Sequence, residues 1–208
     1  MRREELVNVM KIFRRILIGM LLAATSTAAH AEILSLDAIS AYLNRLNTAY
    51  TTFDQQNADG STSSGQLFMA RPGRIRFEYF KPDESIVIAG KGEVVLFDAR
   101  SNDRPQQFQL ANTPLKLILE TDINLLNERM VVGHDFDGKH TVITAQDPRF
   151  PEYGALRLYF DERPQLTRWV LIDGGGGQTT VFLNELEIGA SMPSRLFDID
   201  RELEKRGF

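Results

Sequence analysis

The chain has 208 residues, and its 24 basic and 28 acidic residues give a formal net charge of −4. Five of the basic and two of the acidic residues lie within residues 1–31, so residues 32–208 carry 19 basic and 26 acidic residues, a net charge of −7. Proteins that bind nucleic acids show the opposite excess, because lysine and arginine neutralise phosphates. The charge balance therefore argues against a nucleic-acid partner. The chain has no cysteine, and at this length it can bury a sizeable core without disulfides.

The first 31 residues have the three parts of a secretory signal peptide. Basic residues precede an apolar run from Ile16 to Ala24, and Ala29-His30-Ala31 matches an A-x-A cleavage site. The apolar run is about half the length that a membrane-spanning helix needs. We therefore expect residues 1–31 to be cleaved off on export, and residues 32–208 to form one domain in the periplasm. Without cysteine, the exported chain cannot carry the lipid anchor of a bacterial lipoprotein.

Two segments have helical signals. Ser35 is a candidate N-cap, and apolar residues follow it at three- and four-residue steps as far as Tyr50, which predicts an amphipathic helix of about fifteen residues. In the segment 112–120, Thr113 is a candidate cap and Pro114 occupies the first helical position, which predicts a second helix.

The rest of the chain from Phe53 onward alternates with a period of two and is divided by hairpin-length turns. The expected strands are 64–71, 74–80, 84–90, 93–98, 105–110, 129–136, 139–145, 154–161, 165–173 and 178–188. This pattern predicts an α+β fold with a single large, curved antiparallel sheet, an unclosed half-barrel. We expect the two helices to cover its concave, apolar face.

Motifs of catalysis and metal binding are missing from the sequence. Residues 32–208 contain only two histidines, His134 and His140, and no G-x-S-x-G elbow. The glycine run 174–177 lacks the Lys-Ser/Thr of a phosphate-binding loop. No histidine or carboxylate cluster has metal-ligand spacing. We therefore expect a protein that is not an enzyme, with no catalytic residues, cofactor or metal.

The segment from Arg71 to Tyr79 combines arginines with apolar residues. The residues expected to face inward are Ile75, Phe77 and Tyr79, and those expected on a solvated outer face are Arg74, Arg76 and Glu78. Arg71 lies outside this alternation, directly before Pro72 at a turn. Its spacing alone fits two roles, a turn residue with its head in water or a side chain that reaches over the rim of the sheet.

The stretch "RPGRIRFEYFKPDESIVIAGKGEVVLFD", followed by "NTPLKLIL", resembles the periplasmic outer-membrane lipoprotein carriers, the LolA-type family. The most specific part of the match is the run from Pro82 to Ile86. The sequence differs from the family at Phe77, where tryptophan is usual, and after Phe197, where it lacks the family's proline-containing strand.

The resemblance implies an unclosed barrel whose helices enclose an apolar cavity for the acyl chains of lipoproteins. Such carriers take lipoproteins from an ABC-type release complex in the inner membrane and pass them to an outer-membrane receptor. A periplasmic chaperone of this kind, acting as a monomer, is therefore the leading interpretation. The alternatives are a periplasmic half-barrel domain that senses lipid or a partner without shuttling, and a lipid-directed enzyme, which the missing nucleophile disfavours.

By the same resemblance, Arg71 corresponds to the arginine that hydrogen-bonds the helical lid, and Ile75 and Phe77 correspond to cavity lining. The candidate residues for acyl-chain contact are Arg71, Ile75, Phe77, Tyr79, Leu43, Leu46, Leu115 and Ile118. The apolar members of this set would equally suit an ordinary hydrophobic core.

Overall fold

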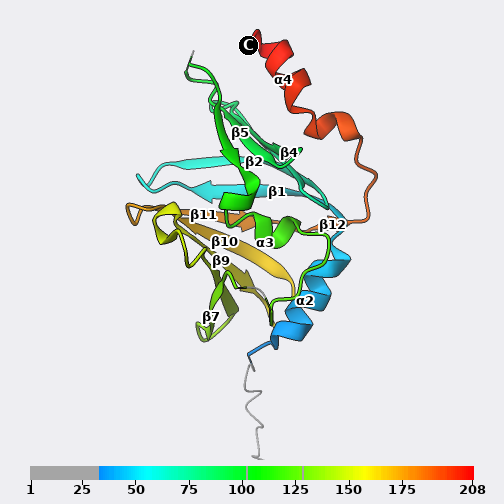
Figure 1. Cartoon of the computed structure of the whole chain (residues 1–208), viewed down its shortest axis with the longest axis vertical. Helices are drawn as coiled ribbons and strands as arrows, with labels where there is room; N and C mark the ends of the chain where they lie inside the picture. The colour runs from blue at the N-terminus through cyan, green and yellow to red at the C-terminus, as the bar shows by residue number, and fades with distance from the viewer. Residues whose placement is uncertain (1–32, 102, 128) are drawn as a thin grey trace, which may run out of the picture. The chain divides into compact units, whose positions relative to one another are not determined.

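The computed structural model describes residues 33–208 except residues 102 and 128 (Figure 1). The expected signal peptide lies outside the described residues. In the described part of the chain, no helix combines the length and the apolar character needed to cross a membrane.

One antiparallel sheet of twelve strands forms the body of residues 33–208. The strands are β1 (Thr48–Gln56), β2 (Thr62–Ala70), β3 (Arg74–Tyr79), β4 (Ile86–Gly90), β5 (Glu93–Phe97), β6 (Gln106–Gln109), β7 (Val131–Phe136), β8 (Thr141–Ala145), β9 (Ala155–Phe160), β10 (Leu166–Ile172), β11 (Gln178–Leu183) and β12 (Glu187–Ile188). Their order is β6-β5-β4-β3-β2-β1-β11-β10-β9-β8-β7, with β12 paired to β1. The two ends of this order, β6 and β7, are not neighbours, so the sheet is unclosed and the predicted half-barrel is confirmed.

The first helix, α2 (Leu36–Arg45), begins where the sequence predicts and ends earlier. The Ser35 hydroxyl accepts a hydrogen bond from the amide of Ala38 at 3.2 Å, which is the predicted N-cap. The predicted end near Tyr50 is wrong, because that residue lies in β1, a strand that the sequence reading missed. β1 pairs with β2 along its whole length, from Thr48 to Gln56, so this long hairpin outweighs the continuing helical pattern.

The second helix, α3 (Lys116–Leu119), is a single short turn preceded by a 3-10 turn, η1 (Leu110–Asn112). The predicted Thr113 cap is wrong, since its hydroxyl donates to the carbonyl of Leu110 at 3.0 Å. After α3 the chain is extended again and passes α2 on its way to β7 (Figure 1). We call residues 120–125 the strap.

One face of the sheet, which we call the inner face, carries the main hydrophobic core together with α2, α3 and the strap. Of the apolar trio of β3 predicted to face inward, Ile75 and Phe77 are buried in this core, and Tyr79 is partly buried and packs against it. The buried core residues are Ile39, Tyr42, Leu43, Leu46, Ala49, Phe53, Leu67, Met69, Ile75, Phe77, Ala89, Val94, Leu110, Leu117, Ile118, Leu119, Ile123, Leu125, Ile143, Ala145, Leu156, Leu158, Phe160, Leu166, Trp169 and Val181.

The C-terminal segment packs on the opposite, outer face of β3–β5. It consists of a 3-10 turn, η3 (Ser194–Phe197), and the helix α4 (Ile199–Arg206), whose N-cap is Asp198. Ile199 and Leu203 of α4 pack on a second apolar cluster. The sheet residues of that cluster are Ile86, Ile88, Val95 and Phe97.

This packing corrects the prediction of a solvated outer face of β3 at one of its three residues, Arg76. Arg76 is only 6% exposed, and its guanidinium donates to Glu78 at 2.6 Å and to Glu202 of α4 at 3.2 Å. It also donates to the carbonyl of Leu196 at 3.2 Å. The alternation of β3 is as predicted, but η3 and α4 cover Arg76, while Arg74 and Glu78 stay half-exposed.

Candidate functional site

An apolar cavity lies on the inner face, between the two helices and the sheet. It measures about 20 Å³, and the ten residues that line it are Leu43, Leu46, Leu67, Met69, Ile75, Ile118, Leu166, Trp169, Leu183 and Leu186. Every lining side chain is apolar. Roughly 10–15 Å³ is enough for one water molecule, so this cavity is far too small for an acyl chain. A chain could enter only after part of the cover has moved.

Four of the predicted contact residues line this cavity: Leu43 from α2, Leu46 directly after that helix, Ile75 from β3 and Ile118 from α3. Helices and strands that are far apart in the sequence therefore meet around one apolar space. This arrangement suits an aliphatic ligand and offers no polar anchor within the cavity itself.

The three other apolar candidates lie outside the cavity lining. Phe77 packs edge-on against Trp169 with ring centroids 6.0 Å apart, so it supports the lining from the side. Tyr79 donates its hydroxyl to the side-chain oxygen of Gln55 at 2.8 Å, and burial raises its pKa to about 12. Leu115 is half-buried and packs on the main core.

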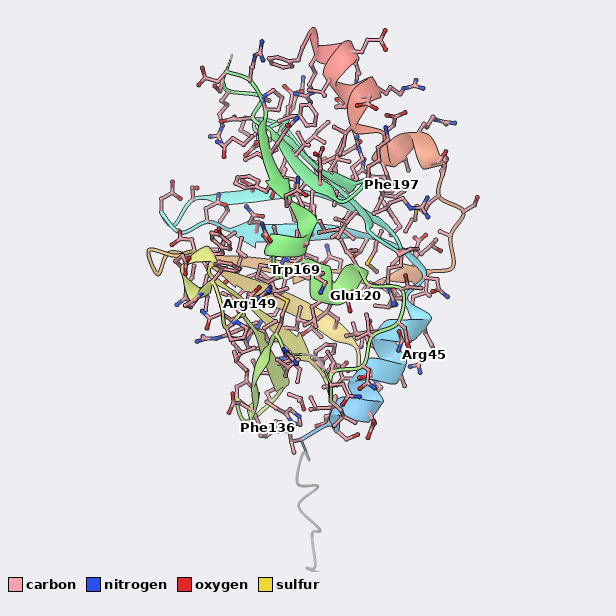
Figure 2. All side chains as sticks on the ribbon, in the orientation of Figure 1. Arg45, Glu120, Phe136, Arg149, Trp169 and Phe197 are labelled. Carbon is pink, nitrogen blue, oxygen red and sulfur yellow. The ribbon has the colours of Figure 1, made fainter. Side chains whose placement is uncertain are left out.

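Trp169 and Leu166 are lining residues that the sequence reading missed. Both point inward although they are three positions apart, because the register of β10 against β9 shifts between Leu166 and Arg168. Such a bulge breaks the period of two on which the face assignment depends. Trp169, the only tryptophan of the chain, can be found in Figure 2.

Arg71 lies at the end of β2 and reaches both covering elements. It is 8% exposed, and its Nε and Nη2 atoms donate to the carbonyl of Glu120 at 2.8 and 2.6 Å. Nη2 also donates to the carbonyl of Thr121 and to the side-chain oxygen of Asn44, each at 3.2 Å. Nη1 donates to the carbonyl of Leu43 in α2. The guanidinium therefore connects the sheet, α2 and the strap.

The acceptors around Arg71 are neutral oxygens, so its charge is held by dipoles. Burial lowers the pKa of Arg71, and the nearby charges of Asp122 and Glu120 oppose that change. An arginine remains protonated under such conditions. The site thus keeps a buried, multiply hydrogen-bonded cation next to the apolar cavity.

The local backbone fixes the direction of Arg71. Its amide donates to the carbonyl of Asn47 at 2.7 Å, which ties the end of β2 to the start of β1. Two residues later Gly73 has a φ of 69°, and its amide donates to the carbonyl of Leu119 at 2.7 Å. The turn that carries Arg71 is therefore bonded to the end of α3.

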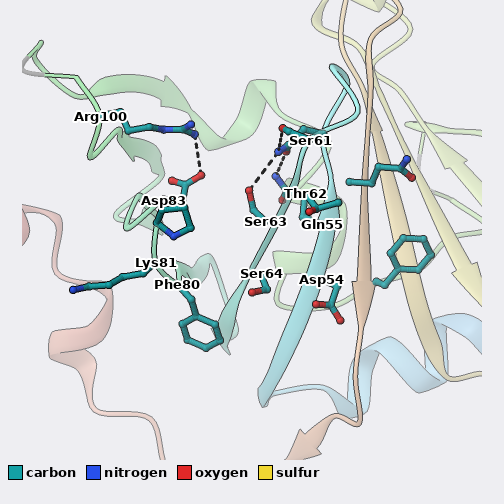
Figure 3. A pocket seen from close by; sticks show the side chains of 14 residues that line it. Asp54, Gln55, Ser61, Thr62, Ser63, Ser64, Phe80, Lys81, Asp83 and Arg100 are labelled. Carbon is teal, nitrogen blue, oxygen red and sulfur yellow. Dashed lines mark hydrogen bonds and ion pairs between the residues drawn. The ribbon is translucent and has the colours of Figure 1, made fainter.

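A much larger open groove, of about 580 Å³, lies elsewhere, along the tip of the β1–β2 hairpin and the turn after β3 (Figure 3). Its lining includes serines, amides and the ion pair between Arg100 and Asp83 at 3.0 Å. None of the predicted contact residues belongs to it. Hydroxyl, amide and charged groups lose water when an alkyl chain covers them, so the small apolar cavity is the better candidate for acyl chains. Among the described residues, no group of three or more histidine, aspartate or glutamate residues could hold a metal ion.

The comparison with a family model and the comparison with related sequences point to one family. The family model of the outer membrane lipoprotein carrier protein LolA matches residues 44–200. An outer-membrane lipoprotein carrier protein from Pseudomonas paraeruginosa is 25% identical over 201 residues, which cover 92% of this chain and 95% of the relative. Its counterpart from Azotobacter vinelandii is 27% identical over 202 residues, covering 91% and 94%. Among solved structures, a LolA superfamily protein from Nitrosomonas europaea superposes with a TM-score of 0.46 and 9% identity, covering 81% of this chain and 99% of that one.

Proposed function

The chain belongs to the family of outer membrane lipoprotein carrier proteins, and on this premise we propose that it is a periplasmic chaperone that shields the acyl chains of lipoproteins. It takes them from an ABC-type release complex in the inner membrane and delivers them to a receptor in the outer membrane. It acts as a monomer and catalyses no reaction. Residues 1–31 direct its export to the periplasm and are then cleaved off.

The physical need for such a protein follows from the cost of exposing lipid to water. Transfer of a sixteen-carbon chain into water is unfavourable by about 12 kcal/mol, at roughly 0.8 kcal/mol per methylene. Lipoproteins carry more than one such chain and would not cross an aqueous compartment unescorted. An apolar interior that opens on demand removes this barrier.

The observation that carries the proposal is the position of Arg71 over an apolar cavity that is nearly filled in the empty protein. Its hydrogen bonds to Glu120 and Leu43 stabilise the closed form. Opening therefore costs free energy, which offsets part of the binding energy of the cargo and keeps release possible. We propose that Arg71 is the latch of the closed state.

Trp169 offers a direct test because it lines the cavity and no other tryptophan contributes to the fluorescence. A fatty acid brominated along its chain should quench Trp169 when it binds to the mature protein, and acylated lipoprotein should restore the signal by displacing it. Quenching absent at every concentration below the micelle limit would contradict the proposal.

A matched pair of variants on β2 sharpens this test. Met69 lines the cavity, whereas its neighbour Phe68 lies on the outer face and packs on Tyr50. Met69→Gln should weaken binding of the brominated fatty acid at least tenfold, and Phe68→Gln should leave it within twofold. Binding without any transfer to outer-membrane vesicles would instead favour a lipid-sensing half-barrel domain.

A further inference from the structure

Asn44, a residue of α2 that the sequence reading did not single out, makes a two-way hydrogen bond with the strap. Its Nδ2 atom donates to the carbonyl of Ile123 at 2.8 Å, and its Oδ1 atom accepts from the amide of the same residue at 2.9 Å. The same Oδ1 atom accepts from Nη2 of Arg71. One side chain thus satisfies both backbone groups of Ile123 and is itself held in place by Arg71.

The helix that carries Asn44 is firmly attached to the sheet. The chain passes directly from α2 into β1, and Ile39 and Leu43 of α2 are fully buried. The hydroxyl of Tyr42 accepts a hydrogen bond from the amide of Leu166 in β10 at 3.1 Å. Burial does not distinguish α2 from α3 and the strap, whose Leu117, Leu119 and Leu125 are also fully buried. The direct continuation into β1 and the bond to β10 do distinguish it, and on this ground we take α2 as the fixed wall of the cavity.

The other cover, which we call the lid, comprises α3 and the strap, residues 116–125. Its only regular element is four residues long. It is bonded to its surroundings at separate points, by Gly73 at Leu119, by Arg71 at Glu120, and by Asn44 at Ile123. The strap also donates a bond to α2 at its far end, where the amide of Leu125 donates to the Ser40 hydroxyl at 3.1 Å.

We propose that Asn44 is a second latch residue, which holds the lid to the fixed wall while Arg71 holds it to the sheet. This proposal builds on the carrier function and specifies how the site opens. The lid moves away from α2 and the sheet as one piece, so Ile118 leaves the cavity while Leu43, Leu46 and Ile75 remain. The acyl chain then enters along the line between α3 and α2.

Hydrogen exchange in the empty protein tests the proposal without any lipid. The amide of Gly73 lies in the sheet turn, and its acceptor, the Leu119 carbonyl, lies in the lid. It therefore exchanges when the lid leaves. Asn44→Ala should accelerate exchange at Gly73 about tenfold, although Asn44 does not bond to Gly73, and should leave the amide of Ile39 within α2 unchanged.

Two further variants control the comparison. Arg45→Ala changes the adjacent, exposed residue of the same helix and should leave exchange at Gly73 unaltered. Asn44→Leu, a side chain of nearly the same size, loses both bonds to Ile123 without adding a charge beside Arg71, so it should act in the same direction by about the same factor. It also replaces Asn44→Ala if that variant fails to fold. Acceleration confined to Ile123, with Gly73 unchanged, would assign Asn44 a local structural role and overturn the proposal.

A lipid measurement on the same variants separates this inference from the carrier function. Asn44→Ala should bind the brominated fatty acid about tenfold more tightly than the unchanged protein, because the closed state is weakened. If exchange at Gly73 responds as expected but neither the variant nor the unchanged protein binds the fatty acid, the carrier function fails and the lid assignment stands. If the unchanged protein binds and Asn44→Ala leaves both exchange at Gly73 and affinity unaltered, the second latch is refuted.

Discussion

Replacement of Arg71 by leucine should convert the protein into a carrier that accepts cargo and releases it poorly. The substitution removes donors to four oxygen atoms, two on α2 and two on the strap. A hydrogen bond to a charged group contributes about 1.5–3 kcal/mol. Leucine also adds apolar surface next to the cavity. The closed, empty state is therefore destabilised, and the open, loaded state gains apolar contacts with the acyl chain.

The expected size of the effect follows from those bonds. If only one of these hydrogen bonds contributes to stability, the closed state loses about 1.5 kcal/mol, which is roughly a tenfold change in the population of the open state. If one bond to each cover counts, the change is about a hundredfold. Transfer of lipoprotein from loaded Arg71→Leu to receptor-bearing outer-membrane vesicles should therefore slow by roughly ten- to a hundredfold, while loading is retained.

The control is Arg74→Leu, the same chemical change three residues later. Arg74 lies on the outer face, where its guanidinium packs over the ring of Phe197, so transfer should stay within about twofold. Arg71→Lys, which keeps the charge and loses the fork geometry, should give an intermediate rate. Transfer by Arg71→Leu at the rate of the unchanged protein would refute the latch.

Three further outcomes concern the C-terminal segment. Glu202→Gln should lower the free energy of unfolding measured in urea. The loss should be less than the roughly 3–5 kcal/mol typical of a broken buried ion pair, because Arg76 keeps its bond to Glu78. An unchanged urea midpoint would count against a stabilising role of the pair between Arg76 and Glu202. Burial alone would raise the pKa of Glu202, but hydrogen bonding by Arg206 and the charge of Arg76 outweigh it and lower that pKa. The contribution of Glu202 to stability is therefore complete above the ordinary glutamate pKa of about 4.3 and disappears as the pH falls through the lowered pKa. An acid-active protease should therefore cleave α4 faster at a pH below the lowered pKa than at a pH above about 4.3. Equal cleavage at these two pH values would argue against this role of Glu202. Gly90→Ala would place a Cβ atom 2.7 Å from the carbonyl oxygen of Phe197. The variant should be destabilised by about 1–3 kcal/mol and should still bind acyl chains. A stability equal to that of the unchanged protein would mean that the C-terminal segment shifts freely.

The sequence alone was enough to predict the architecture, because the relevant signals are local. Period-two alternation and hairpin turns are properties of a few neighbouring residues, and they identified most strands of the unclosed sheet. The Ser35 cap and the inward direction of Ile75 and Phe77 rest on equally short patterns. The resemblance of the segment around Arg71 to a known family was visible for the same reason, since its motif is contiguous.

Tertiary structure decided the features that depend on distant parts of the chain. The sequence places Arg76 on the outer face but cannot show that Glu202, 126 positions later, covers it. The shift in β10 brings Trp169 into the cavity against the expected alternation. The side-chain amide of Asn44 can bond to the strap only because the fold brings Ile123, 79 positions away, beside it. Burial and hydrogen bonding of this kind arise from packing between elements. A local sequence pattern does not determine which distant element packs on a given face.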